Sequence, residues 1–559
     1  MLSGCNSNLT DIQDENTLFG SSTRIRGFDP IKAGDVSTAL AVSKVYEGLY
    51  QYDYRARPYR LIPLLAEKMP AVSENGLVYT FNIRPGIHFQ DNPCFLEKNG
   101  VGREVTAADF VYSIKRVADM QAGSSGFWVF RNRIVGLDAF REQSSGGNRV
   151  NYDQKVVGLQ AIDRYTLQIR LIKPYPQLLW ILAMPYAYVV PREAVDYYGA
   201  DFLNHPVGTG PFVLSEWRRN YRLEYCSNPA WRWRSAETEA SRGETTNTLS
   251  RIVHYVMDDA STRWLAFLHG QLDLYVDIAR DNWDVIFTPD QELNDSLSKQ
   301  GIRLHTIAGL NVYYIGMNMD DPVLGTNKKL RQALTCAFNS KEWVEYYHGR
   351  IVRAHCPIPP GVAGHVSGAG VLGFDLQRAK HLLAEAGYPD GIDPETGRRL
   401  VLKLDLGKTD TEMRESTELF IDFMDKIGVV IEPEYNNKPA FFKKIEKRQV
   451  QLFRLSWFAD YPDGQNFLQL FYSPNASPGP NRVNYVNSAF DRLYEEASSL
   501  QDCPERTVLY QQLARMIMDD CPWIFTHYPV DYSLTHDWLE NYYPSDFPYG
   551  MEKYYHKSR

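Results

Sequence analysis

Two carboxylates, Asp460 and Asp463, stand three residues apart near the C-terminal end of the chain. A pair of carboxyl groups can act as general acid and base in the hydrolysis of a glycosidic or peptide bond. The residues between and after them, Tyr461-Pro462 and Gly464, are also typical of a tight turn, in which Asp caps local backbone N–H groups. The pair therefore leaves two interpretations open, a hydrolytic site and a structural turn.

The sequence contains none of the usual signatures of nucleophilic or metal-dependent hydrolases. There is no G-x-S-x-G and no H-E-x-x-H, and Gly407-Lys408-Thr409 lacks the preceding glycine of a phosphate-binding loop. Gly368, Gly370 and Gly373 form a G-x-G-x-x-G, but a proline-rich stretch precedes it where a dinucleotide site needs a strand. The twelve histidines are scattered and the seven cysteines form no C-x-x-C. We therefore expect no cofactor, no metal and no nucleotide.

Composition narrows the class of protein further. The chain has 559 residues, of which 44% are hydrophobic and 23% charged, as in globular proteins, and its length predicts at least two lobes. The net charge of −8 argues against a nucleic-acid partner. The longest apolar run, at residues 178–184, is far shorter than the roughly 20 residues of a membrane-spanning helix.

The N-terminal residues predict attachment to a membrane surface through a lipid. Leu2-Ser3-Gly4-Cys5 is similar to the lipobox of bacterial lipoproteins, in which the cysteine receives a lipid. The polar residues that follow, up to Ser22, are typical of a flexible tether. We expect lipidation at Cys5, so that acyl chains hold the protein at a membrane surface. The alternative is a chance LSGC sequence.

Strands and helices alternate in the manner of an α/β protein. Apolar periodicity, capping residues and glycine stops predict strands at 77–84, 212–217, 252–257, 272–276 and 313–319, and helices at 106–120, 261–269, 328–338, 375–387 and 505–520. The elements between 252 and 276 would form a βαβ unit, and polar stretches at 141–151 and 235–247 would be loops. A helix over 505–520 also excludes a disulfide between Cys503 and Cys521, because its ends lie more than about 20 Å apart.

Several motifs then identify a resemblance along nearly the whole chain. Residues 205–212, HPVGTGPF, resemble the signature of family 5 extracellular solute-binding proteins, the peptide-binding components of ABC importers. Other blocks follow in the order of that family: Phe28-Asp29-Pro30, Val45–Leu49, Leu64–Glu67, Val78–Phe81 with Arg84 and Gly86, Thr106–Ser113, Asn228-Pro229 with Trp231, Ala379–Tyr388, and Trp457–Tyr461 with Phe467-Leu468. In the signature itself, Gly208, Gly210 and Pro211 predict a rigid turn with a structural role.

The resemblance implies an α/β, two-lobed periplasmic-binding-protein fold of the class II type, with an additional third domain and hinge crossings between the lobes. The expected division of the chain is a lipobox and tether at 1–22; lobe I at 23–46, 181–276 and 533–559; the additional domain at 47–180; and lobe II at 277–532.

The resemblance also implies a ligand site. Asp460 matches the Asp of a W-x-x-D motif that takes the α-ammonium of a peptide, and a carboxylate in a cleft of low dielectric favours a cationic guest. Arg454 matches a basic position suited to a ligand carboxylate or to an internal partner. Trp457 would stack on the ligand or lie in the core beneath it. Phe441 and Phe442 match an aromatic near the ligand, or begin an ordinary helix. The peptide main chain would pair with strand edges, so side-chain identity would matter little.

The function expected on these grounds involves no chemistry. The protein would be a monomeric substrate-binding lipoprotein in the periplasm or at the cell surface, anchored to a bacterial membrane. It would capture short peptides by lobe closure and deliver them to an ABC permease in the cytoplasmic membrane. Two alternatives stay open: the same fold with a nickel chelate, haem, opine or sugar as its solute, and a secreted hydrolase that uses Asp460 and Asp463.

Overall fold

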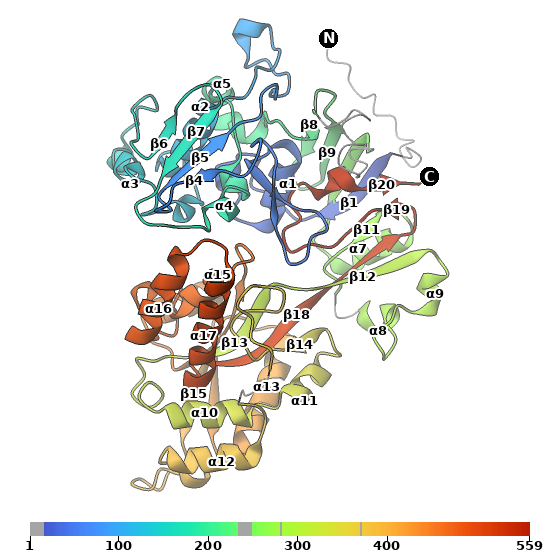
Figure 1. The fold of residues 1–559 in the computed structure, drawn as a ribbon. Coiled ribbons are helices and arrows are strands. Elements are labelled where there is room, and N and C mark those ends of the chain that lie inside the picture. Colours follow the sequence, from blue (N-terminus) through green and yellow to red (C-terminus); the bar gives the residue numbers. More distant parts are fainter. Residues whose placement is uncertain (1–15, 233–248, 280–281, 369–371, 559) are drawn as a thin grey trace. The chain divides into compact units, whose positions relative to one another are not determined.

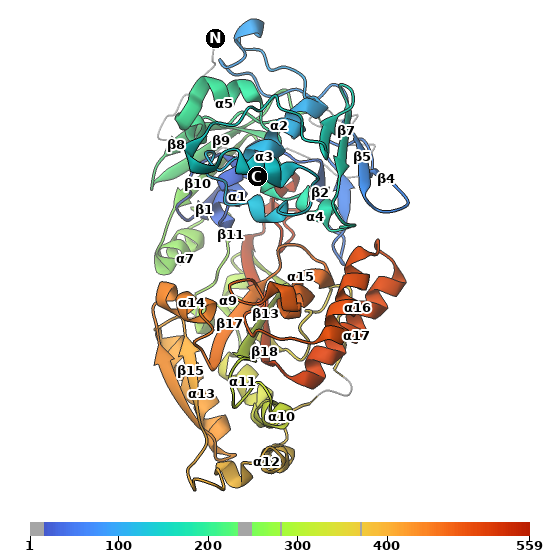
Figure 2. The ribbon, with the colours of Figure 1, turned by 90° about the vertical axis from the view of Figure 1, so that its left-hand side faces the viewer.

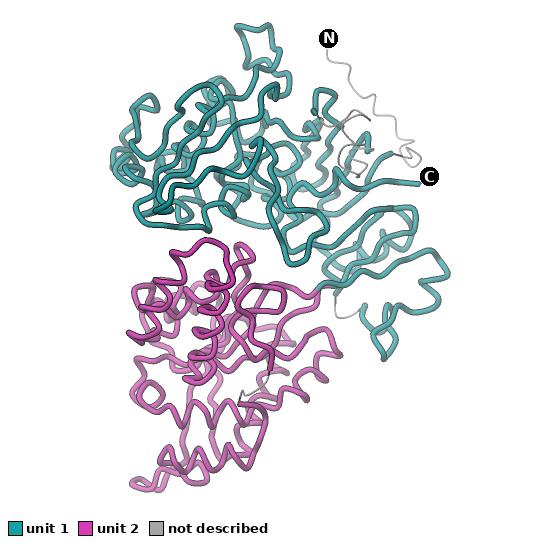
Figure 3. Tube along the Cα trace, in the orientation of Figure 1, with its two compact units in different colours: residues 1–307, 532–559 teal, residues 308–531 magenta. Residues whose placement is uncertain are grey.

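A computed structural model describes residues 16–232, 249–279, 282–368 and 372–558. The chain forms two compact units (Figure 3): unit 1 comprises residues 1–307 and 532–559, and unit 2 comprises residues 308–531. The boundaries fall inside two strands, β12 (Ile302–Ala308) and β18 (Trp523–His536). The finer division into two lobes and an additional domain stays a prediction.

One sheet of unit 1 has the strand order β1-β10-β9-β8. Its strands are β1 (Thr17–Ser22), β8 (Phe212–Arg218), β9 (Arg222–Ser227) and β10 (Arg251–Val256). The strands predicted at 212–217 and 252–257 are therefore confirmed. Residues 17–22 correct our expectation of a tether, because they form β1, parallel to β10. Thr17 and Leu18 are buried, and the missing side chain of Gly20 leaves room for the ring of His254.

A second sheet of unit 1 has the order β4-β5-β7-β6. It consists of β4 (Ala71–Val72), β5 (Val78–Asn82), β6 (Leu159–Ala161) and β7 (Thr166–Arg170). Tyr79, Phe81, Leu167 and Ile169 alternate toward the interior, which explains the strand predicted at 77–84. Helix α2 (Ala107–Ala118) packs against β6 and β7 and confirms the helix predicted at 106–120.

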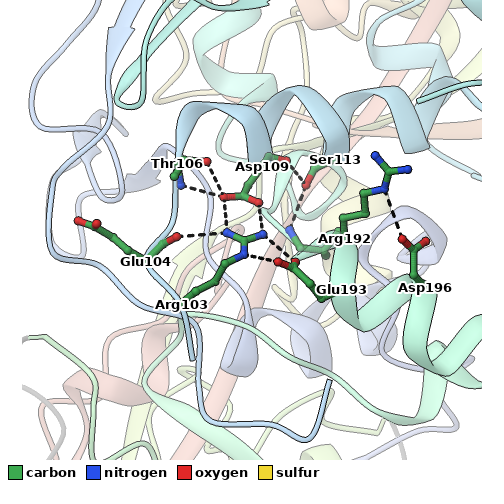
Figure 4. A network of polar contacts seen from close by, with 9 residues as sticks. Arg103, Glu104, Thr106, Asp109, Ser113, Arg192, Glu193 and Asp196 are labelled. Atoms are coloured by element: carbon green, nitrogen blue, oxygen red, sulfur yellow. Dashed lines mark hydrogen bonds and ion pairs between the residues drawn. The ribbon is translucent and has the colours of Figure 1, made fainter. Parts of the chain in front are cut away.

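A dense set of ion pairs fixes the beginning of α2 (Figure 4). Thr106 and Asp109 form a capping box, in which the Thr106 N–H donates to Asp109 Oδ2 at 2.8 Å. Arg103 bridges Asp109, at 2.6 Å, and Glu193 in the first turn of α5 (Arg192–Tyr198). Ser113 accepts a hydrogen bond from the Val190 N–H at 3.0 Å. Each acidic group of this cluster has a basic partner, so the network holds α2 and α5 together.

Three of the motif blocks meet at Glu47, which is 2% exposed. Its carboxylate pairs with Arg232 at 2.7 Å and accepts hydrogen bonds from Thr209 Oγ1 at 2.9 Å and Trp231 Nε1 at 3.3 Å. Thr209 lies in the PVGTGPF segment. The glycines of this segment pack closely against the backbone next to Glu47. A Cβ on Gly208 would lie 2.0 Å from the carbonyl oxygen of Val45. The segment therefore serves close packing inside unit 1.

Unit 1 contains further helices and strands outside these two sheets. Its helices include α1 (Val36–Val45), α3 (Leu137–Glu142), α4 (Leu178–Ile181), α7 (Ala260–Leu268), α8 (Trp283–Ile286) and α9 (Asp295–Ser298), and its strands β2 (Tyr50–Tyr52), β3 (Leu61–Pro63), β11 (Leu274–Tyr275), β19 (Leu539–Glu540) and β20 (His556–Lys557). Helix α7 and strand β11 confirm the elements predicted at 261–269 and 272–276. The βαβ interpretation is wrong, because β10 and β11 belong to different sheets. Residues 141–142, expected in a loop, end α3.

The main sheet runs through unit 2 in the order β18-β13-β17-β15-β16, with β11 beyond β18 and with β12 and β14 also paired to β18. Its further strands are β13 (Asn311–Met317), β14 (Ile351–Arg353), β15 (Val401–Leu406), β16 (Val430–Tyr435) and β17 (Leu452–Phe458). Figure 2 shows β17 between β13 and β15, with helices beside the sheet. Strand β17 runs antiparallel to β13 and parallel to β15.

Helices cover this sheet and enclose the core of unit 2 (Figure 1). They are α10 (Lys328–Ala337), α11 (Ser340–Tyr346), α12 (Leu376–Glu385), α13 (Thr411–Asp425), α14 (Lys438–Glu446), α15 (Gly464–Leu468), α16 (Ser488–Ser499) and α17 (Pro504–Asp520). The strand and helices predicted at 313–319, 328–338, 375–387 and 505–520 are confirmed. Cys503 and Cys521 flank α17 as free thiols. In the described parts of the chain, we find no helix with the length and apolarity needed to cross a bilayer.

Candidate functional site

Strand β17 presents two of the predicted site residues on opposite faces of the sheet. Arg454 lies opposite Ile315 of β13, and Trp457 lies opposite Val312. Because side chains alternate along a strand, residues three apart point to opposite faces. Their contacts agree, since Arg454 contacts α11 and α13 whereas Trp457 contacts α15. Arg454 and Trp457 therefore do not form one binding surface on this strand.

Asp460 follows β17 and is held by a single amide side chain. Asn466 Nδ2 donates to Asp460 Oδ2 at 3.0 Å, and Asn466 Oδ1 accepts the Asp460 backbone N–H at 3.1 Å and the Trp457 Nε1–H at 2.9 Å. In the described chain no cation pairs with Asp460. Burial raises the pKa of its carboxyl to about 6, and the hydrogen bond from Asn466 acts in the opposite direction. The site therefore holds a half-buried carboxylate without a counter-charge.

Asp463, by contrast, has its charge neutralised inside unit 2. It is 3% exposed, pairs with Arg506 at 3.1 Å and accepts the Tyr510 hydroxyl at 3.0 Å. It also caps α15 through the Gln465 N–H at 2.9 Å. A carboxylate occupied in this way supplies neither the base nor the nucleophile that the hydrolase interpretation requires. The turn interpretation of the Asp463-Gly464 pair fits these contacts.

Arg454 lies in a pocket of neutral side chains. Its guanidinium donates to Tyr347 Oη at 2.8 Å, to Ser416 Oγ at 2.6 Å and to Met413 Sδ at 3.4 Å, and it lies 5.0 Å from the centre of the Trp343 ring. Among the described residues it has no carboxylate partner. The internal ion pair that we considered for Arg454 is therefore not observed in that part of the chain.

A histidine beside Arg454 adds hydrogen-bonding capacity but no charge. Burial lowers the pKa of His527 well below its usual range, and the charge of Arg454 lowers it further. Trp343 Nε1 donates to His527 Nδ1 at 3.3 Å, so the neutral ring carries its proton on Nε2. Tyr313 stacks on this ring with a centroid distance of 4.3 Å.

Phe441 and Phe442 lie in α14, away from the contacts made by Asp460. Phe441 is 2% exposed and its ring packs on the backbone of Gly407, where a Cβ would lie 2.6 Å from the ring. Phe442 is half-buried and meets Phe441 edge to face at 5.6 Å. Neither ring has a described contact with Trp457 or Asp460. Phe441 is accordingly a core residue of unit 2.

Within the described residues, no group of three or more His, Cys, Asp or Glu side chains could hold a metal ion. Gly370 of the G-x-G-x-x-G, the predicted lipidation site at Cys5 and the predicted loop at 235–247 lie outside these residues.

The structure thus brings Trp457 and Asp460 together through a residue that our sequence analysis missed. Asn466 is fully buried, although asparagine is usually exposed. The signal was present in the sequence, because Asn466 directly precedes the apolar run Phe467-Leu468 and is therefore a polar residue among core residues. Spacing alone could not show that it reaches back six residues to Asp460.

Comparison with known proteins gives the family. The model of the bacterial extracellular solute-binding proteins, family 5 (Middle), matches residues 60–479 of the 559. This match covers more than half of the chain, and the chain therefore belongs to that family.

Curated relatives cover most of the chain at low identity. Heme-binding protein A of Haemophilus influenzae is 26% identical over 499 residues, which are 88% of this chain and 83% of the relative. The dipeptide-binding protein of Escherichia coli is 25% identical over 529 residues, 91% of this chain and 89% of the relative. These relatives are named for binding a solute and not for catalysis.

Solved structures share the fold. HbpA2 from Haemophilus parasuis superposes with a TM-score of 0.80 at 24% identity and covers 97% of this chain and 100% of its own. The periplasmic binding protein DppA from Helicobacter pylori, solved with the peptide STSA, gives 0.72 at 22% identity, with 97% and 98% covered. The α/β periplasmic-binding-protein fold predicted from the sequence is confirmed. The protein is a family 5 bacterial extracellular solute-binding protein.

Proposed function

We propose that the protein captures short peptides with a free amino terminus, and that Asp460 receives the α-ammonium group. The observation that carries this proposal is the Asp460 carboxylate, which has one amide partner and no cation among the described residues. A buried charge without a partner costs free energy, and an arriving ammonium ion removes that cost. The site therefore favours a cationic guest.

Arg454 supports the second half of the proposal. Its partners among the described residues are neutral, and a guanidinium suits the carboxylate of a free C-terminus. Trp457 contributes apolar surface only, since its indole N–H is already bonded to Asn466. A short peptide carries both an amine and a carboxylate; because Arg454 lies on the face of β17 opposite Trp457, its pairing with that carboxylate is tested on its own.

Calorimetry with an unmodified tripeptide and its N-acetylated form tests the proposal. We expect Asp460→Ala to weaken binding of the unmodified peptide by about 3–5 kcal/mol, a few hundred- to a few thousand-fold in Kd. Acetylation of the wild-type ligand should have an effect of similar size, because it removes the ammonium. The variant should bind the two peptides equally. Unchanged affinity of Asp460→Ala for the unmodified peptide would exclude Asp460 from the site.

Asp460→Asn is the matched variant, because it keeps the shape and the contact with Asn466 but removes the charge. It should lose most of the affinity for the unmodified peptide. Recovery of the peptide intact after incubation would separate a receptor from a hydrolase.

One comparison favours haem as an alternative solute, because a relative is named Heme-binding protein A. Adding haemin to the purified protein and following its absorption spectrum tests this alternative. Displacement of haemin by the tripeptide would indicate one shared site.

The remaining parts of the proposal concern cellular context. The protein would act as a monomer, anchored through Cys5 at the periplasmic or cell-surface side of a bacterial membrane, and the predicted lobes would close on the ligand and deliver it to a permease. Mass spectrometry of the protein purified from its own cell tests lipidation directly, since an acylated Cys5 adds a defined mass.

A further inference from the structure

Asn466 occupies an unusual place for an amide. It is fully buried, at 0% exposure, in the five-residue helix α15. Its oxygen accepts two N–H groups, from Trp457 Nε1 and from the Asp460 backbone, and its nitrogen donates to Asp460 Oδ2. One side chain therefore contacts the indole, the backbone and the carboxylate of the candidate site.

Only one orientation of this amide satisfies its surroundings. With the oxygen toward the two N–H donors and the nitrogen toward the carboxylate, all three contacts are attractive, at 2.9, 3.1 and 3.0 Å. The flipped amide would place its NH₂ group against two donors and its oxygen against a carboxylate. A buried donor or acceptor left unpaired loses its hydration without a replacement hydrogen bond, so the fold holds one orientation. The amide in turn fixes Oδ2 of Asp460 and leaves Oδ1 without a described hydrogen bond.

The position of Asn466 is itself determined by an independent network. Asp463 caps α15 and is tied to Arg506 and Tyr510 of α17. Gln465 accepts the Tyr461 hydroxyl at 2.8 Å and donates to Tyr494 of α16 at 2.5 Å. Two of the three residues that precede Asn466 are thus anchored to the large helices of unit 2. A group fixed in this way can hold a carboxylate in one direction before any ligand is present.

We infer that Asn466 is a positioning residue for ligand capture, which aims Oδ1 of Asp460 at the incoming ammonium and keeps Asp460 ionised by donating to Oδ2. This inference rests on the proposed role of Asp460. It adds a residue that need not touch the ligand but sets the acidity and direction of the group that does. It also assigns the Trp457 indole N–H to the framework of the site.

The charged groups on the packed elements do not provide this control. Asp463 is neutralised by Arg506, and Arg454 lies on the other face of β17. Tyr461, Tyr494 and Tyr510 are occupied in the network described above. The shift in the pKa of Asp460 has two causes, burial and the hydrogen bond from Asn466. Asn466 is therefore the group through which the acidity of Asp460 can be changed.

Proton release on binding tests the inference. It is measured by calorimetry of the unmodified tripeptide in buffers of different ionisation enthalpy, from pH 5 to pH 8.5. In the wild-type protein, with the pKa of Asp460 at about 6, an ammonium guest should expel about half a proton at pH 6. Near pH 8, where Asp460 is already ionised and the free peptide amine is partly unprotonated, binding should instead take up protons.

Two variants should move this profile in one direction. In Asn466→Ser the donor to Oδ2 is lost, so release should persist to higher pH and affinity at pH 7.5 should fall about tenfold. In Asn466→Asp the two acids should share a proton near neutral pH, and binding at pH 7.5 should then release more protons than in the wild-type protein, since the uptake by the peptide amine is the same in both. Affinity for the N-acetylated tripeptide should change by less than twofold in both.

Asn327→Ser is the control for lost amide contacts. Asn327 also lies in unit 2, where its side chain accepts the Leu330 N–H at 3.1 Å and donates to the Ala386 carbonyl at 2.8 Å. This variant should show the wild-type proton release. If both Asn466 variants keep the wild-type midpoint, the positioning role is wrong even when their stability falls. If the wild-type protein binds the unmodified and the N-acetylated tripeptide with equal affinity, the amine does not meet Asp460, and both proposals fail.

Discussion

Glu47 in unit 1 and Asp460 in unit 2 are acidic side chains in motif blocks of the same family, yet the fold treats their charges in opposite ways. Glu47 meets Arg232, Thr209 and Trp231, so its charge and both of its oxygens are occupied. Asp460 meets one amide, and no cation in the described chain. A saturated carboxylate stabilises a fold, whereas an unsaturated one costs stability and is available to a guest. Burial of an acid therefore does not by itself distinguish a structural role from a binding role.

Asp463 makes the same point within one loop. It lies three residues from Asp460 and is the more buried of the two, but Arg506 and Tyr510 occupy it. The difference between these neighbours is the presence of a partner and not the residue type. Variants at these positions test whether the presence of a partner sets the role of each carboxylate.

The largest effect is expected at Glu47. Glu47→Ala leaves Arg232 without its carboxylate in the interior of unit 1 and should destabilise that unit by about 3–5 kcal/mol. Hydrogen exchange across residues 207–232 measures the loss, because the two units need not unfold together. Glu47→Gln, which keeps the volume, separates lost charge from lost packing. Unchanged protection in Glu47→Ala would mean that the pair contributes nothing to the fold.

Asp460→Asn should change stability in the opposite direction. The folded-state pKa of about 6 lies above the unfolded value of about 3.9, so between these values the folded state holds a proton that the unfolded state lacks. Stability contributed by this group therefore falls as the pH rises through that window. Above pH 6 the ionised carboxylate costs up to about 3 kcal/mol, less whatever water still reaches it. Urea unfolding should show the variant more stable than wild type at pH 8 and equal at pH 3.5; a loss at pH 8 would contradict an uncompensated charge.

Substitution of Arg454 should affect ligand affinity more than the stability of the fold. Its partners are neutral, so Arg454→Gln strands no buried acid among the described residues. If Arg454 receives the C-terminal carboxylate, the variant should weaken a free-acid peptide by about 2 kcal/mol and a C-amidated peptide much less. Calorimetry with the matched pair of peptides gives this difference. An equal loss for both would assign Arg454 to the framework of unit 2.

The smallest effect is expected at Thr209. Thr209→Val removes one hydrogen bond to Glu47 and leaves Arg232 in place, so unit 1 should lose about 1 kcal/mol. Thr209→Ser, which keeps the hydroxyl, should lose less. Hydrogen exchange of the same segment as for Glu47 measures both. A loss as large as that of Glu47→Ala would show that the hydroxyl, and not the ion pair, dominates this cluster.

Much of the local structure could be read from the sequence. Alternating apolar residues predicted β5, the turn at Gly208–Pro211 predicted the start of β8, and capping residues at Thr106 and Asp375 predicted the starts of α2 and α12. These signals are local, since each depends on the side chains of a single element. The pairing of strands is not local. The βαβ interpretation failed for this reason: β10 and β11 are close in sequence, but each found its partners elsewhere.

The candidate site shows the same limit at the level of single residues. The spacing of Arg454 and Trp457 places them on opposite faces of a strand, a consequence that follows from strand periodicity once the strand is known. The core position of Phe441 was not separable from a ligand contact, because a helix start and an aromatic wall look alike in sequence. The contacts of Asn466 could not be predicted from the sequence, because they depend on how the turn after Asp460 folds back.

Motif order identified the family and the acid at position 460, and local periodicity identified part of the helices and strands, because both are properties of the linear chain. Which of the buried acidic groups are neutralised by a basic partner depends on the tertiary fold. It neutralises Glu47 with Arg232, 185 residues away, and Asp463 with Arg506, whereas the only side-chain partner of the Asp460 carboxylate among the described residues is the amide of Asn466. Ion pairs between side chains that are distant in sequence form only when the chain packs in three dimensions. The difference between a paired, structural carboxylate and one that is available to a ligand therefore exists only in the folded molecule.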